Sequence, residues 1–260
     1  MQRVMFHSTV FGPIRSRRLG TSLGINLMPD DGKVCSFDCL YCEAGFNAQG
    51  AGTTGLPSRE KVRGDLESKL ALMKEDGQGL DVITFSGNGE PTLHPDFAGI
   101  VDDTLELRDV YFPEAKVSVL TNSTRIDRPD VADALLRVDN NLLKLDSALN
   151  GTLRVIDRPN QPGFSAEGVI EQLKRFEGQG IIQTMMLRGE YEGVKIDNTT
   201  DEEIAALAEA YRVIRPREVM IYSLDRPTPA KGLVKVGADE LKAIGERLER
   251  ESGVKVVVSV

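Results

Sequence analysis

Six short apolar runs alternate with segments of helical periodicity along most of this chain, and that alternation limits the folds it can adopt. The runs read as buried strands and cover residues 23–27, 82–85, 117–120, 142–145, 181–187 and 219–224. Repeated strand–helix units predict a parallel sheet with right-handed crossovers. The periodicity leaves open whether the sheet curls into an open barrel or spreads into a doubly wound sheet.

The segments between these runs carry apolar residues at three- and four-residue spacing, which predicts helices with one buried face. These stripes cover residues 62–73, 97–105, 131–136, 169–176 and 204–211. Thr200 followed by Glu203 is a capping-box pattern for the last of them, and Pro216 ends it. A further helix over 241–248 ends at Gly253, before a β-rich tail over 254–260.

The chain has only three cysteines, Cys35, Cys39 and Cys42, and they lie within eight residues. An odd, clustered set suits a metal centre in a reducing compartment better than a disulfide framework. Structural zinc needs a fourth ligand, and both histidines, His7 and His94, lie far away in sequence. A [4Fe-4S] cluster on three thiolates would leave one iron open for a cosubstrate, so both kinds of centre remain possible.

Composition narrows the class of protein. The chain has 260 residues and a formal net charge of -8, which argues against an extended nucleic-acid surface because phosphate binding needs clustered Lys and Arg. No stretch approaches the roughly 18 apolar residues of a membrane span, and the first residues lack a long apolar core. We therefore expect a cytoplasmic, single-domain enzyme with no membrane partner.

Polar clusters follow four of the expected strands, at the sheet edge where ligands of parallel sheets gather. The cysteine loop follows the first strand and falls on the same edge. The clusters are 86–91, Thr121-Asn122, Asp146-Ser147 and Arg188-Gly189.

The Cys-x3-Cys-x2-Cys loop, with Tyr41 before its last cysteine, resembles the signature of the radical S-adenosylmethionine (SAM) superfamily. Residues 16–20 and 86–95 resemble the iron-sulfur oxidoreductases related to the tRNA wyosine-synthesising enzyme. The resemblance implies an α/β fold, a partial (β/α)6 barrel of the radical SAM type with a C-terminal helix-strand extension. We expect the partial barrel, its N-terminal segment and the cluster loop in residues 1–225, with 226–260 packed on the same domain.

The resemblance also implies the cofactors and the chemistry. Cys35, Cys39 and Cys42 would hold one [4Fe-4S] cluster, SAM would bind its open iron, and Tyr41 would lie near the adenine. Reductive cleavage of SAM would give a 5'-deoxyadenosyl radical that takes hydrogen from a small or nucleotide-like substrate, since cofactors carry such chemistry. Flavodoxin or ferredoxin would donate the electron.

Further contacts to SAM are expected from Gly87, Asn88, Gly89 and Glu90, which resemble the family's Gly-Gly-Glu-Pro motif with Asn88 between the glycines. Glu90 is the candidate partner of the SAM ammonium group, because a carboxylate forms a charge-assisted hydrogen bond there. The alternative for the glycines is a tight turn that needs their backbone freedom.

Asn122, Asp146 and Ser147 match places where relatives contact the ribose or the methionine carboxylate, and Arg188 could face that carboxylate. The structural alternatives are a turn at Asn122, a helix cap or a Lys144 partner at Asp146, and a surface salt bridge at Arg188.

Three further features have open interpretations. Arg15, Arg17 and Arg18 would clamp an anionic substrate group or pin the N-terminal segment to acidic surface. Residues 226–229 would form a lid or an ordinary connection. His94 fits a cap for the next helix better than a ligand.

The chain lacks the additional cysteines of the wyosine-type relatives, which disfavours wyosine synthesis and auxiliary-cluster peptide modification. Two alternatives to a radical SAM enzyme of small substrates remain. One is an activase that installs a glycyl radical on a partner protein, and the other is a non-catalytic zinc or iron-sulfur binding module.

Overall fold

The computed structural model describes residues 3–16 and 20–260, and its centre is one sheet of mostly parallel strands. In their order across the sheet, the strands are β1 (Val10–Ser16), β2 (Gly20–Ile25), β3 (Val82–Phe85), β4 (Lys116–Thr121), β5 (Asn140–Lys144), β6 (Ile181–Tyr191), β8 (Glu218–Ser223) and β10 (Val256–Ser259). β7 (Val194–Asp197) and β9 (Leu233–Lys235) pair antiparallel with the far end of β6.

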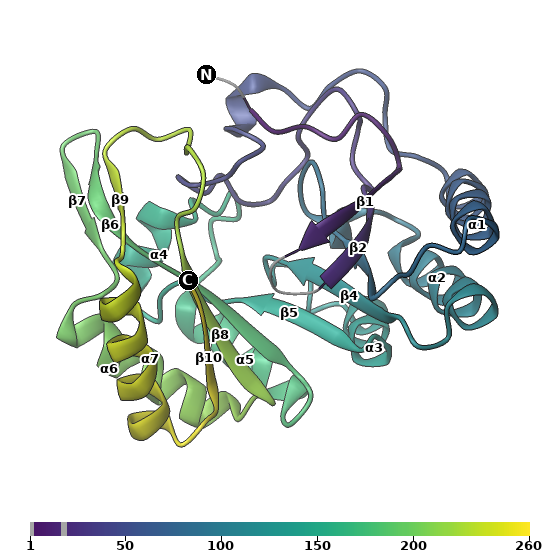
Figure 1. The fold of residues 1–260 in the computed structure, drawn as a ribbon. Helices are drawn as coiled ribbons and strands as arrows, with labels where there is room; N and C mark the ends of the chain where they lie inside the picture. Colours follow the sequence, from purple (N-terminus) through teal and green to yellow (C-terminus); the bar gives the residue numbers. More distant parts are fainter. Residues whose placement is uncertain (1–2, 17–19) are drawn as a thin grey trace.

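The strand order identifies the architecture. From β2 to β8 the main strands follow chain order, and each pairs in parallel with the next. A doubly wound sheet would reverse its order partway. Figure 1 instead shows a curved sheet with helices on its outer side and open edges at β1 and β10. The fold is therefore the predicted partial barrel, and the doubly wound alternative was wrong.

The crossover helices cover the outer face of this sheet and hold the main apolar core against it. Leu66 and Leu70 of α1 and Leu207 and Tyr211 of α6 are among the fully buried residues there. The helices are α1 (Arg59–Glu75), α2 (Phe97–Tyr111), α3 (Pro129–Arg137), α4 (Asn150–Ile156), α5 (Ala166–Leu173), α6 (Asp201–Ile214) and α7 (Ala238–Ser252). Short 3-10 turns lie at Asn47–Gln49, Pro91–Leu93 and Lys174–Phe176.

The six predicted strands and the six predicted helices are confirmed. Thr200 caps α6 by accepting a hydrogen bond from Glu203 N at 3.3 Å. The Glu203 carboxylate turns instead to Ser147, so only half of the capping box forms. The elements that the periodicity missed are β1, α4, β7 and β9, which are short or half-exposed and show no clear apolar repeat.

Residues 226–260 extend the same sheet. β9 pairs with β6, α7 packs on α6, and β10 adds to β8 in parallel. A domain boundary at residue 225 stays a prediction. Within the described ranges, no helix is long and apolar enough to cross a membrane.

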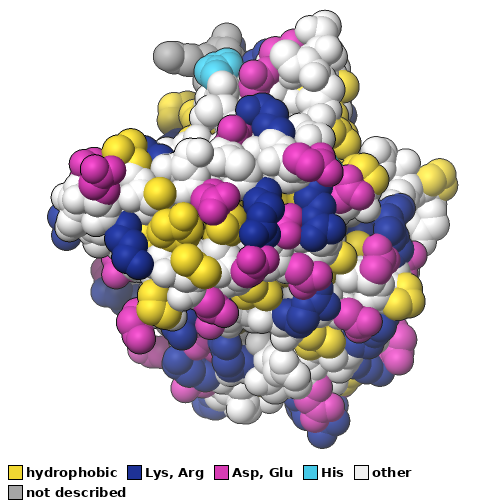
Figure 2. All heavy atoms as spheres, turned by 90° about the vertical axis from the view of Figure 1, so that its right-hand side faces the viewer, with side chains coloured by type: hydrophobic (Ala, Val, Ile, Leu, Met, Phe, Trp, Pro, Cys, Tyr) yellow, Lys and Arg dark blue, Asp and Glu magenta, His cyan; other side chains and the backbone are white. Residues whose placement is uncertain are grey.

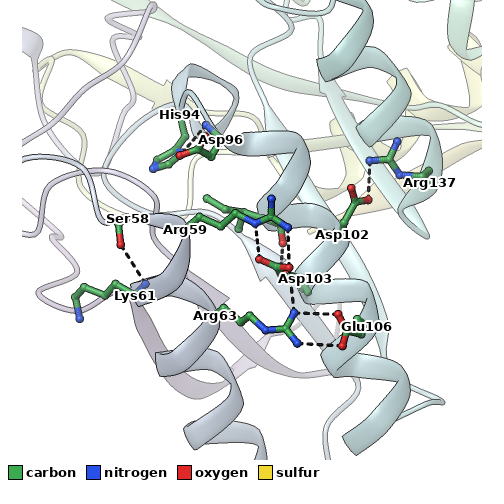
Figure 3. A network of polar contacts seen from close by, with 12 residues as sticks. Ser58, Arg59, Lys61, Arg63, His94, Asp96, Asp102, Asp103, Glu106 and Arg137 are labelled. Carbon is green, nitrogen blue, oxygen red and sulfur yellow. Dashed lines mark hydrogen bonds and ion pairs between the residues drawn. The ribbon is translucent and has the colours of Figure 1, made fainter.

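A network of ion pairs joins α1 to α2 on the outer surface. Figure 2 shows Lys and Arg side chains interspersed with Asp and Glu on this face. In Figure 3, Arg59 and Arg63 of α1 converge on Asp103 of α2, with N–O distances of 2.7 and 3.0 Å. Arg63 also binds Glu106 at 2.9 Å. Asp103 is buried, whereas Glu106 is exposed. Asp103 is therefore the centre of the network.

We expect Asp103→Asn to lower the free energy of unfolding by about 1–3 kcal/mol, because it removes charge-assisted bonds to two arginines at a buried position. Urea denaturation at pH 7 measures this. Glu106→Gln is the matched control and should change stability by less than about 0.5 kcal/mol, as exposed pairs do. Equal effects of the two substitutions would contradict the central role of Asp103.

The same network predicts a pH dependence. The hydrogen bond from Arg59, and further contacts with both arginines, lower the pKa of Asp103. A depressed folded-state pKa gives stability that is fully present above about pH 4, the unfolded range of a carboxyl, and is lost as pH falls through the folded value. In Asp103→Asn this part of the acid destabilisation should be absent.

Candidate active site

The three cysteines lie on a loop that follows β2 and crosses the carboxyl edge of the sheet. All three are free thiols; Cys39 is buried, and Cys35 and Cys42 are partly buried. Burial raises the pKa of Cys39, and burial with the nearby Glu90 raises that of Cys35 to about 12. Because thiols ligate metals as thiolates, binding here would release protons.

Backbone hydrogen bonds dock this loop on the segment that follows β3. Val34 N donates to Asn88 O at 3.1 Å, and Glu90 N donates to Val34 O at 3.0 Å. Val34 and Gly89 thereby form an isolated parallel bridge. Since Cys35 is the next residue, this bridge determines where the first thiol lies relative to the sheet.

Other chain segments approach Gly87 and Gly89 so closely that no side chain would fit at either position. Gly89 has φ of +153°, and a Cβ atom there would lie 1.8 Å from Val34 O. Gly87 has φ of +142°, and its Cβ would lie 2.4 Å from Asn26 Oδ1. Both glycines thus have a structural reason independent of a ligand, and their predicted contact with SAM stays a prediction.

Asn88 holds three segments together. Its Oδ1 accepts from Phe6 N at 2.9 Å, and its Nδ2 donates to Phe6 O at 2.7 Å and Pro29 O at 2.8 Å. Its backbone N donates to Asn26 Oδ1, and its backbone O accepts from Val34. Every polar atom of Asn88 therefore has a protein partner, which gives it a structural role, and its predicted contact with SAM stays a prediction.

Glu90 is fully buried and links the docking segment to β4. Its Oε1 accepts from Thr92 N, Thr92 Oγ1 and Thr121 Oγ1 at 3.1, 2.6 and 2.7 Å. Its Oε2 accepts from Asn122 N at 2.6 Å. Burial raises the pKa of Glu90, and the hydrogen bonds partly offset that rise. Four donors satisfy the carboxylate, which gives Glu90 a positioning role whether or not it contacts SAM.

Asn122 joins this network to the cysteine loop. Its Nδ2 donates to Ser36 Oγ at 2.9 Å and lies 3.6 Å from Cys35 Sγ. Its Oδ1 accepts from Thr124 N at 3.1 Å. The structure thus brings two predicted site residues, Asn122 and Cys35, into direct contact.

Tyr41 and Asp146, also predicted from the sequence, meet below the loop. The Tyr41 hydroxyl donates to Asp146, and Lys144 Nζ donates to that hydroxyl. Lys144 Nζ lies 3.3 Å from the Asp146 carboxylate and 4.7 Å from the Tyr41 ring centroid. Burial raises the pKa of Tyr41, and the neighbouring Asp146 adds to the shift. The partnership of Asp146 with Lys144 confirms that structural alternative.

Two residues of this region were missed in the sequence. Asp157 follows α4, and its carboxylate accepts from Cys39 Sγ at 3.3 Å. Lys33 is buried beside the cysteine loop. Asp157 gave no signal because its contact spans more than a hundred residues. Lys33 gave no signal either, because it follows Pro29-Asp-Asp-Gly32, a polar stretch that reads as an exposed turn.

Ser147 and Arg188 face away from the cysteine loop. Ser147 Oγ donates to Glu203 of α6 at 2.7 Å. Met185 and Leu187 of β6 pack with the loop's apolar side chains, so Arg188, one residue further, points to the other face. Arg188 forms an ion pair with Glu240 at 2.5 Å on α7. The salt-bridge interpretation of Arg188 is confirmed, and neither residue enters the proposed site.

The remaining predictions concern residues outside the site. His94 accepts from Asp96 N at 3.1 Å through Nδ1 and contacts Pro57 O through Nε2 (Figure 3). The N-cap of α2 is Asp96, and no described side chain caps this helix, so the cap predicted for His94 was wrong: His94 holds the turn that precedes the helix. Arg226 binds Glu43 of the cysteine loop at 2.6 Å. Arg15 lies on β1, whereas Arg17 and Arg18 lie outside the described residues.

Among the described residues, no group of three or more His, Cys, Asp or Glu side chains is arranged around a single metal ion. A [4Fe-4S] cluster binds each thiolate through a different iron, so its ligands need not meet at one point. The three cysteines are buried or partly buried on one loop that is bonded to the sheet edge, and the side-chain amide of Asn122 lies beside Cys35. These features fit such a cluster.

Relatives of known sequence extend over most of the chain. A protein described as "GTPase Obg" from Brachyspira hyodysenteriae is 28% identical over 96% of this chain but 35% of its own length. The "UPF0026 protein MJ1312" of Methanocaldococcus jannaschii is 32% identical over 85% of this chain and 65% of its own. The chain thus spans about one third of the length of the first relative and about two thirds of the length of the second.

Solved structures share the fold at low sequence identity. A radical SAM methyltransferase from Sphaerobacter thermophilus superposes with a TM-score of 0.64 at 17% identity, over 92% of this chain and 65% of that one. TYW1 with a lysine-pyruvate adduct bound gives 0.64 at 15% identity, over 92% and 77%.

The family model described as "Radical SAM superfamily" matches residues 31–193, which include the cysteine loop, its docking segment and the strands from β3 to β6. The matched part therefore carries both the site geometry and most of the parallel sheet. The chain belongs to the radical SAM superfamily, whose enzymes bind SAM and a [4Fe-4S] cluster.

Proposed function

We propose that this chain uses one [4Fe-4S] cluster, held by Cys35, Cys39 and Cys42, to cleave SAM reductively and abstract hydrogen from a small or nucleotide-like substrate. The observation that carries the proposal is the docking of all three cysteines at the carboxyl edge of a partial barrel. We further propose that the enzyme works in the cytoplasm and that flavodoxin or ferredoxin supplies the electron.

The bound cofactors supply a 5'-deoxyadenosyl radical, and the residues of the chain position and shield the site. Glu90 and the bridge at Val34 hold the loop on the sheet. Phe37, Leu40 and Tyr41 pack the loop against apolar side chains of β6, which keeps water out of that side.

SAM contacts are proposed for Tyr41, Asn122 and Asp146. Leu120 and Leu142 line the interior of the partial barrel. Because strand side chains alternate, Asn122 and Lys144, each two residues beyond one of these leucines, point to the same interior. Tyr41 and Asp146 contact Lys144 there. Backbone groups of Gly87 and Gly89 remain candidates at the same edge.

A cavity of about 180 Å³ in the barrel interior supports a small substrate. The described residues that line it are uncharged and come from β1 to β8 and the N-terminal segment: Phe6, Phe11, Ile14, Ser22, Gly24, Thr84, Ser86, Leu120, Leu142, Gln183 and Met220. Hydroxyl and amide groups on an apolar wall favour a neutral substrate moiety with few hydrogen-bonding groups.

Anaerobic reconstitution with iron and sulfide, followed by dithionite and SAM, tests the function. We expect cluster-dependent formation of 5'-deoxyadenosine, measured by chromatography. Cys39→Ala and the nearly isosteric Cys39→Ser should both lose the cluster and this product, because each removes one thiolate ligand.

Thermal unfolding of the metal-free proteins is the control, and it should show that both variants fold. A folded Cys39 variant that still cleaves SAM would contradict the ligand assignment. A wild-type protein that stays colourless with iron but binds zinc tightly would favour the metal-binding module.

Glu90→Gln distinguishes positioning from ligand contact. In the variant, an NH2 group replaces one carboxylate oxygen and faces a hydrogen-bond donor that the oxygen of Glu90 accepts from in the wild type. We therefore expect the free energy of unfolding to fall by about 1–3 kcal/mol. Iron content after reconstitution should fall as well, because Asn122 is displaced from Cys35.

Glu203→Gln is the matched control. Glu203 is also a buried acid that accepts a side-chain hydrogen bond, but it lies on α6 against the outer face of the sheet. It should lower stability without lowering iron content. Full iron content with weakened SAM binding in Glu90→Gln would instead identify Glu90 as a SAM contact.

A further inference from the structure

Lys33 is a charged side chain buried within the cysteine loop. It precedes Cys35 by two residues, and its side chain is 1% exposed. A buried ammonium group is costly unless nearby negative charge or hydrogen bonds compensate it. The surroundings of Lys33 must therefore provide that compensation.

An uncharged backbone carbonyl provides one hydrogen bond to the Lys33 ammonium group. Lys33 Nζ donates to Gly45 O at 2.8 Å, and Gly45 N donates to Cys42 O at 2.9 Å. Lys33 thus reaches from the start of the cysteine loop to the backbone just beyond its third cysteine. Its ammonium group is held in place, not left to rotate in solvent.

The charged neighbour of Lys33 is Asp38, whose Oδ1 lies 3.6 Å from Nζ. That carboxylate is shared, because it also accepts from Asn47 N at 2.6 Å and lies 3.7 Å from Arg158 Nη2. Two cations therefore share one carboxylate. Asp38 alone leaves positive charge at Lys33 uncompensated.

The other ionisable groups of the loop next to Lys33 are the cysteines. Cys35 follows Lys33 by two residues, and Gly45, whose O accepts from Lys33 Nζ, donates through its N–H to Cys42 O. A metal centre binds cysteines as thiolates. Thiolates held on this loop would therefore supply the negative charge that Asp38 alone does not.

We propose that Lys33 is the fixed cation that raises the reduction potential of the cluster at Cys35, Cys39 and Cys42, an inference that rests on the proposed function. With three thiolates, [4Fe-4S]2+ carries a net charge of -1, and one electron from a reductant makes it -2. A nearby positive charge stabilises the more negative state, strongly so away from water. Lys33 is thus a positioning and electrostatic residue that does not contact the substrate.

Lys33→Met tests the proposal because methionine keeps a long, unbranched side chain and removes the charge. Each protein is reconstituted with iron and sulfide and titrated with dithionite without SAM, and electron paramagnetic resonance follows the reduced cluster. We expect the equilibrium constant for reduction to fall at least tenfold in Lys33→Met, which is 59 mV for one electron. Lys33→Arg keeps the charge and should stay within about threefold of the wild type.

Lys61→Met is the matched control, since Lys61 is an exposed lysine on α1 paired with Asp65. It should leave the potential unchanged. A Lys33→Met protein with full iron content and the wild-type potential would overturn the inference.

Lys33→Gln decides the matter if Lys33→Met fails to retain a cluster. It removes the charge but keeps a side-chain N–H donor for Gly45 O, and it should lower the equilibrium constant for reduction at least tenfold, whereas the wild-type potential would overturn the inference. A wild-type protein that takes up no cluster would instead overturn the proposed function, and this inference with it.

Discussion

The parallel bridge between Val34 and Gly89 is the contact on which the rest of the site depends. The cysteine loop has no regular secondary structure around its thiols, so its position comes from where its backbone is tied. A Cβ on Gly89 would collide with Val34 O, so this approach is open only to glycine. The motif that follows β3 therefore acts first as a docking surface for the loop, and any contact with SAM is built on that.

Glu90 extends this docking into the barrel. Its carboxylate holds the backbone of Asn122, and the Asn122 side chain reaches Ser36 and Cys35. One buried acid thus couples the ends of β3 and β4 to the first cysteine. Such a network is stable only when every member is satisfied, which explains why a segment expected to contact SAM is mostly occupied with protein partners.

The fold was largely predictable because its signals are local. Val, Ile and Leu runs and helical stripes identified the six main strands and six helices, and three cysteines in eight residues identified the site. Asp157 was missed because its contact with Cys39 joins distant parts of the chain, and Lys33 because its burial depends on how the irregular cysteine loop folds back on Gly45. Arg188 could not be decided from the sequence, because a position at the end of a strand does not say which face its side chain takes, and the structure shows the salt bridge to Glu240. The long-range pairing that sets this face is not local in sequence.

Electrostatics gives the loop a second kind of constraint. The chain carries a formal net charge of -8, yet one buried and one partly buried lysine approach its cysteines. Lys33 lies within the loop and lowers the pKa of Cys35, while Lys144 at the end of β5 does the same for Cys39, in each case against the effect of burial. Buried cations are retained at a cost in desolvation. Lys144 is paired with Asp146 and Tyr41, whereas the position of Lys33 is the one that the proposed cluster, an anionic centre that becomes more negative on reduction, would favour.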